Sequence, residues 1–193
     1  MNKALDISCN NVPQFKGTTL IVLDVSGSMM SRIKGITPAR IGSVFAAILS
    51  KANLDSDFMV FDNSARYQQL NPLDSTMTIA KSIPFTGGGT NFHSIFQRAN
   101  KPYDRIIILS DMQGWMDAYG SRDVPKSFRN YCAKNKVQPH LYSFDLAGYG
   151  SLQFPQNKVY CIAGFSDKVF DLMNVLEQDR NALINRIKAI ELD

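Results

Sequence analysis

Three oxygen-bearing side chains, Asp24, Ser26 and Ser28, stand at every second position directly after an apolar run. That run, residues 18–23, is apolar or β-branched throughout, as in a strand that is buried on both faces. Gly27 allows a tight turn, so the carboxylate and the two hydroxyls can point at one spot. Oxygen-only ligands of this kind suit a hard cation such as Mg²⁺ or Mn²⁺.

Two later stretches carry further oxygen ligands. Residues 86–91 read Thr-Gly-Gly-Gly-Thr-Asn, and residues 103–109, which we expect to form a second buried strand, lead to Asp111. Because ligands of open α/β sheets bind beyond the carboxyl ends of the strands, Asp24 and Asp111 share that edge if their strands are parallel neighbours. The three glycines let the loop approach a ligand and deliver Thr90 at a helix start. The alternative interpretation of the glycines is a flexible linker.

Together, the three segments resemble the metal-ion-dependent adhesion site of von Willebrand factor A domains, and the likeness covers nearly the whole chain. The resemblance implies five metal ligands, some acting through water: Asp24, Ser26, Ser28, Thr90 and Asp111. It implies Mg²⁺ as the cofactor, with Mn²⁺ or Ca²⁺ as alternatives, and an acidic side chain of a partner protein at the open position. More narrowly, residues 87–93 and 104–115 are similar to the C-terminal A domain of bacterial Ro (TROVE) ribonucleoproteins.

This narrower resemblance implies a non-catalytic binding module. Ro proteins bind small noncoding RNAs through a helical-repeat ring that the A domain closes, and this sequence contains no such helical repeats. One alternative is a protein-binding adaptor, unrelated to RNA, that takes a partner carboxylate at the metal. A less favoured alternative is a metal-dependent phosphohydrolase, because Ser26 stands where that chemistry usually places a second aspartate. His93 and His140 also lack the order and neighbours of a catalytic triad.

Three residues near the expected metal are candidates for a rim that contacts the partner. Trp115, the single tryptophan, follows Asp111 in a loop and could anchor a partner or simply pack within that loop. Asn91 and His93 follow Thr90 closely. The plainer interpretation of His93 is a helix residue with one polar contact.

The composition is that of a globular domain, with 193 residues, 45% of them hydrophobic and 20% charged. We expect a lead-in segment over residues 1–17 and one domain over residues 18–193. The net charge of +4 permits contact with nucleic acid without requiring it, because the basic residues form no run. Three cysteines without zinc spacing favour reduced thiols, and the sequence shows no signal peptide and no apolar run of membrane-spanning length. These features predict a cytoplasmic protein with no membrane contact.

Alternating strands and helices predict the fold class, an α/β protein with a doubly wound, mostly parallel sheet of about six strands and helices on both faces. Thr37 and Pro38 predict the start of a helix whose apolar stripe continues to Ala52. The expected strands cover residues 57–62, 103–109, 137–144 and 159–164, besides 18–23 and an antiparallel edge strand over 66–70. The other expected helices cover residues 75–83, a stretch after Thr90, a stretch from Asp123, and a tract from 166 or 167 to 192. Leu5, Ile7 and Val12 are candidates for a further short edge strand.

Overall fold

The computed structural model contains one six-stranded sheet with the strand order β3-β2-β1-β4-β5-β6. It describes residues 12, 14–32, 35–113, 124–148, 157–164, 168–178 and 188. All neighbouring strands are parallel except β2 and β3, which are antiparallel. The strands are β1 (Thr19–Asp24), β2 (Asp57–Phe61), β3 (Ala65–Tyr67), β4 (Arg105–Ser110), β5 (His140–Asp145) and β6 (Val159–Ala163). The predicted α/β sheet with one antiparallel edge strand is confirmed.

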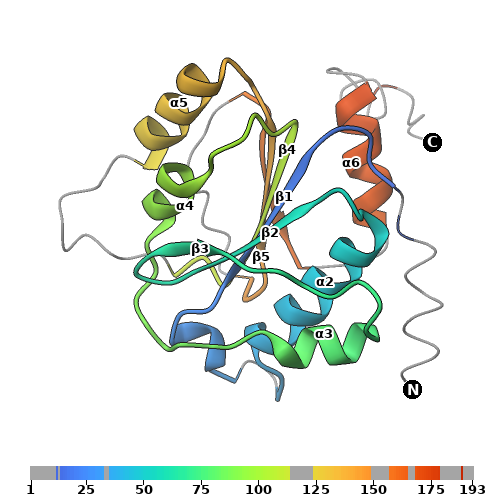
Figure 1. Cartoon of the computed structure of the whole chain (residues 1–193), viewed down its shortest axis with the longest axis vertical. Coiled ribbons are helices and arrows are strands. Elements are labelled where there is room, and N and C mark those ends of the chain that lie inside the picture. Colours follow the sequence, from blue (N-terminus) through green and yellow to red (C-terminus); the bar gives the residue numbers. More distant parts are fainter. Residues whose placement is uncertain are drawn as a thin grey trace.

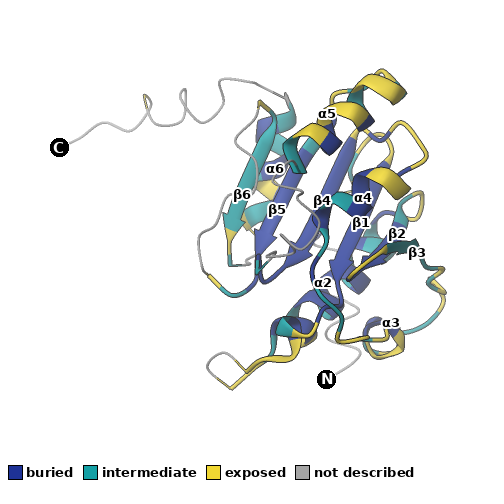
Figure 2. Ribbon diagram, turned by 90° about the vertical axis from the view of Figure 1, so that its left-hand side faces the viewer, coloured by how far each residue is buried: buried dark blue, intermediate teal, exposed yellow. Residues whose placement is uncertain are grey.

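Helices cover both faces of the sheet (Figure 1). One core cluster joins a face of the sheet to α2 and α6, and a second cluster joins the other face to α4 and α5. Figure 2 shows that the central strands are buried along their length, whereas β3 and β6 at the two edges are partly exposed. The helices are η2 (Ser28–Met30), α2 (Pro38–Ala52), α3 (Thr76–Ser82), α4 (Phe92–Arg98), α5 (Val124–Asn135) and α6 (Lys168–Gln178).

The strand order creates a switch point between β1 and β4. From β1 the chain runs outward through β2 and β3, and then returns to place β4 on the other side of β1. Connections on the two sides of a switch point diverge, which leaves a crevice beyond the carboxyl ends of the two strands. The condition set by the sequence, that β1 and β4 are parallel neighbours, is therefore met.

Local signals explain where the elements begin and end. The Thr37 hydroxyl accepts a hydrogen bond from the Arg40 amide at 3.2 Å, so α2 begins at Pro38 as predicted. The hairpin after β2 is tighter than expected, because the Ser64 amide donates to the Asp62 carboxylate. As a result, the edge strand starts at Ala65 and ends at Tyr67, earlier than the predicted 66–70.

Other predicted boundaries shift or fall outside the described residues. The strand expected over 137–144 starts at His140, because the Val137 amide donates a hydrogen bond to the Cys132 carbonyl oxygen near the end of α5. The candidate edge strand at Leu5 and Ile7, the start of α5 at Asp123 and the tract beyond Gln178, save for residue 188, lie outside the described part.

Candidate metal site at the carboxyl edge of the sheet

An aspartate stands at the carboxyl end of each of four neighbouring strands, β2, β1, β4 and β5. Asp24 and Asp145 are the last residues of β1 and β5, and Asp62 and Asp111 directly follow β2 and β4. All four side chains are buried or nearly so. Buried carboxylates are rare unless a positive charge or several hydrogen bonds compensate them, so this edge calls for a chemical explanation.

Asp24 stands at the switch point and is fully buried. Its Oδ1 accepts a hydrogen bond from the Ser26 amide at 2.9 Å, and its Oδ2 accepts one from the Ser110 hydroxyl at 2.6 Å. Burial raises the pKa of Asp24 to about 6, with a small further contribution from the charge of Asp111 and against the effect of these hydrogen bonds. The site therefore holds a carboxylate that is poorly compensated in the absence of a cation.

The predicted ligands Ser26, Ser28 and Asp111 lie around this carboxylate. The hydroxyls of Ser26 and Ser28 are 3.2 Å apart, and Ser28 also hydrogen-bonds the Asp111 side chain. Burial raises the pKa of Asp111, and the nearby charge of Asp145 adds to this rise. Four of the five predicted ligand side chains are thus linked by contacts or by charge within one cluster.

The fifth predicted ligand, Thr90, is carried by the glycine loop that packs against the first segment. The Gly27 amide donates to the Gly88 carbonyl oxygen at 2.9 Å, and the amides of Thr86 and Gly87 both reach the Val25 carbonyl oxygen. A Cβ atom at Gly27 would lie 3.1 Å from the Gly87 carbonyl oxygen, so the close approach of the loops favours glycine there. The loop is therefore docked at the site rather than a free linker, and Thr90 is buried just beyond it.

The residues predicted to form a partner-binding rim differ in their positions. The Asn91 side-chain amide donates to the Asn63 carbonyl oxygen at 3.1 Å and so borders the glycine loop. His93 on α4 is hydrogen-bonded through Nδ1 to the Ser127 hydroxyl on α5. This contact agrees with the plainer interpretation of His93 as a helix residue with a polar contact. Trp115 lies outside the described residues. The rim as a whole stays a prediction.

Sequence reasoning misses two residues of this cluster. Ser110 is part of the motif but not one of the predicted ligands, although its hydroxyl contacts Asp24 directly. Asp145 falls in a loop by its sequence, yet it pairs in register with Ser110 and accepts hydrogen bonds from the amides of Ala147 and Gly148. A signal for Asp145 is present in the sequence, because its strand ends on an aspartate as β1 does.

The donor set fits a hard divalent cation better than a soft one. Asp24 and Asp111 would balance two positive charges, and the hydroxyls of Ser26, Ser28 and Thr90 would add neutral oxygen ligands. Among the described residues, no group of three or more His, Cys, Asp or Glu side chains is arranged to hold a metal ion. A cation at this edge would therefore depend on the hydroxyls, as the sequence motif implies.

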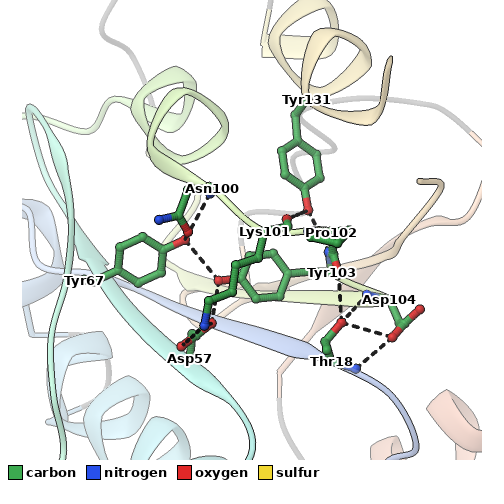
Figure 3. A network of polar contacts seen from close by, with 9 residues as sticks. All are labelled: Thr18, Asp57, Tyr67, Asn100, Lys101, Pro102, Tyr103, Asp104 and Tyr131. Atoms are coloured by element: carbon green, nitrogen blue, oxygen red, sulfur yellow. Dashed lines mark hydrogen bonds and ion pairs between the residues drawn. The ribbon is translucent and has the colours of Figure 1, made fainter. Parts of the chain in front are cut away.

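A second polar network lies at the amino ends of the parallel strands, opposite the candidate metal site (Figure 3). The Tyr103 hydroxyl donates to Asp57 at 2.7 Å and contacts the Tyr67 hydroxyl at 3.0 Å, while Lys101 forms an ion pair with Asp57. A cavity of about 620 Å³ lies beside this network and includes Asp57, Tyr67 and Lys101 in its lining. Because Asp57 and Lys101 are paired with each other, we assign the network to holding the connection between α4 and β4 in place.

Comparisons with solved structures show the fold. The crystal structure of the Ro (RSR) protein from Deinococcus radiodurans matches 86% of this chain at 20% identity, with a TM-score of 0.69. An aerotolerance-related membrane protein from Bacteroides fragilis, solved with multiple mutations to serines, matches 81% of this chain and 96% of its own at 13% identity, with a TM-score of 0.53. No family model and no curated protein matches the sequence. The sequence motifs indicated a von Willebrand factor A fold and a resemblance to Ro proteins. Both structural matches agree with that fold, and the match to the Deinococcus Ro protein agrees with that resemblance.

This chain spans 35% of the length of the Deinococcus Ro protein. Among the described residues, none of the helices is both long enough and apolar enough to span a bilayer.

Proposed function

We propose that this chain is a divalent-metal-dependent binding module. In this proposal Asp24, Ser26, Ser28, Thr90 and Asp111 hold one Mg²⁺ ion, with Mn²⁺ or Ca²⁺ as alternatives. The observation that carries the proposal is the cluster at the switch point, where a fully buried Asp24 lies near Asp111 and two hydroxyls. A divalent cation would compensate both carboxylates, and a position left to water could accept an anionic group from outside.

The proposed partner group is an acidic side chain of another protein. The fold shared with the Deinococcus Ro protein supports a role as the A domain of a Ro-like ribonucleoprotein, in small noncoding RNA binding or its protein contacts. Any contact with the RNA would run mainly through a helical-repeat region that this chain does not contain. The proposed location is the cytoplasm.

The site offers little for catalysis, which favours binding over hydrolysis. Of the two histidines, His93 is engaged by Ser127, and His140 stands at the amino end of β5, at the far edge of the sheet. Metal-assisted hydrolysis normally adds an acid or base beside the metal, and Ser26 takes the place of a second aspartate. We therefore propose that the module is not an enzyme.

Titration with Mg²⁺ tests the metal proposal. The wild-type chain should bind one Mg²⁺ per molecule, and Ser26→Ala should weaken the affinity by about 10-fold or more because it removes a ligand oxygen. Isothermal titration calorimetry measures both. Ser43→Ala is the matched control, since the hydroxyl of this buried serine on α2 donates to the Arg40 carbonyl oxygen, and its loss should leave the affinity unchanged. Equal affinities for all three chains would show that Ser26 is not a ligand.

Defined probes separate a protein partner from RNA. A peptide with a central glutamate should bind only when Mg²⁺ is present, and its glutamine counterpart should not bind. Binding of a structured RNA through phosphates would instead weaken steeply with ionic strength. Peptide binding that persists in EDTA would contradict the role of the metal, and turnover of a generic phosphoester would contradict the non-catalytic assignment.

A further inference from the structure

Ser110 connects the candidate metal site to the backbone that leaves β4. Its hydroxyl donates to Asp24 Oδ2 at 2.6 Å and accepts a hydrogen bond from the Met112 amide at 3.0 Å. Asp24 and Ser110 are both fully buried, so solvent does not compete for these bonds. One hydroxyl thus joins two segments that are 86 residues apart in the sequence.

The backbone at Met112 is strained. This residue has φ of 59°, in the left-handed region that non-glycine residues rarely adopt, and its side chain is buried. The Ser110 hydroxyl holds its amide, the Ser143 hydroxyl contacts its sulfur at 3.2 Å, and the next amide, of Gln113, donates to Asp111 Oδ1. The segment after β4 is therefore held in part by the Ser110 hydroxyl, which contacts Asp24, and by the Asp111 carboxylate.

We infer that Ser110 is a positioning residue of the site, which fixes the Asp24 carboxylate for a cation and couples cation binding to the strained segment at Met112 and Gln113. This inference rests on the proposed metal site, and it adds a way in which the segment after β4 regulates cation binding there. Because both oxygens of Asp24 already accept protein hydrogen bonds, the carboxylate has one orientation before the cation arrives. A partner that moves Met112 would also move Ser110. The factor by which this partner changes the affinity for the cation equals the factor by which the cation changes the affinity for the partner.

Removal of the hydroxyl tests the positioning role. Ser110→Ala should weaken Mg²⁺ affinity by about 10-fold, the lower end of the effect of losing a group that orients a metal ligand. Ser110→Thr keeps the hydroxyl and should restore most of the affinity. Ser43→Ala is the matched control, because it removes a buried hydroxyl that donates to the Arg40 carbonyl oxygen on α2 rather than to the segment after β4, and it should leave the affinity unchanged. Calorimetry on the whole chain measures all four affinities.

Hydrogen exchange tests the coupling in the wild-type chain, whatever the folding of the variants. Mg²⁺ should slow exchange at the Met112 amide, because an immobilised Asp24 holds Ser110 in place. An unchanged rate at Met112 with Mg²⁺ bound would overturn the coupling, and equal affinity of Ser110→Ala and wild type would overturn the positioning role. If wild type binds no Mg²⁺ at all, the proposed metal site fails first, which is a separate result.

Discussion

Asp24→Asn should strongly weaken Mg²⁺ binding and, at the same time, stabilise the metal-free protein. The change removes one of two carboxylates at the proposed site, so we expect the affinity to fall on the order of 100-fold or more. In the metal-free protein it removes a charge that is fully buried and has like-charged Asp111 nearby. Calorimetry measures the first effect, and urea unfolding in EDTA measures the second.

The stabilisation should depend on pH in a defined direction. Burial raises the pKa of Asp24 from 3.8 to about 6, so between these values the folded protein holds a proton that the unfolded chain releases. The metal-free wild type therefore loses stability as the pH rises from about 4 to about 6, by on the order of 3 kcal/mol in total. The amide introduced by Asp24→Asn does not titrate in this range, so the advantage of the variant should be full at pH 7 and absent near pH 4.

An exposed aspartate provides the control for this prediction. Asp55→Asn makes the same chemical change at an exposed position before β2 and should alter neither Mg²⁺ affinity nor unfolding appreciably. Added Mg²⁺ should raise the melting temperature of wild type and of Asp55→Asn but not of Asp24→Asn, since only a bound ligand stabilises the folded state. An Asp24→Asn chain that is less stable than wild type in EDTA at pH 7 would contradict the explanation by burial.

Arg105→Met should lower the free energy of unfolding by about 3–5 kcal/mol, the usual cost of breaking a buried ion pair. Arg105 begins β4 and is only 2% exposed. Its Nε donates to Glu177 on α6 at 2.6 Å, its Nη1 donates to Thr19 on β1 at 2.7 Å, and its guanidinium lies 4.2 Å from the centre of the Phe15 ring. The substitution leaves the Glu177 carboxylate without its main partner, and urea unfolding measures the loss.

Two further variants show whether the ion pair itself is responsible. Lys101→Met breaks the ion pair with Asp57 at a side chain that is 57% exposed, and should cost less than about 1 kcal/mol because solvent screens it. Arg105→Met combined with Glu177→Leu should recover much of the lost stability, because no unpaired charge then remains beside the sheet. A loss below about 1 kcal/mol for Arg105→Met alone would show that the buried pair does not hold α6 to the sheet.

Local patterns in the sequence predict most of the helices and strands, and they indicate the kind of ligand that the proposed site would use. Strand β1 follows from an unbroken apolar run, and α2 follows from Thr37 and Pro38 with an apolar stripe behind them, because such signals act within a few residues. The motif around Asp24 also indicates oxygen ligands for a hard cation without reference to any arrangement in space. The boundaries were less accurate where a local hydrogen bond decided them, as at Asp62 and Ser64 before β3.

Which of these groups come together depends on the fold of the whole chain. The sequence left open whether β1 and β4 are neighbours, because their adjacency depends on how the helices pack on the two faces of the sheet. That adjacency brings Ser110 to Asp24, and the pairing of β4 with β5 places Asp145 beside Ser110. It also places Arg105 beside Thr19 of β1, where the arginine is buried. Strand order and register arise from contacts between residues far apart in the chain, which no local pattern encodes.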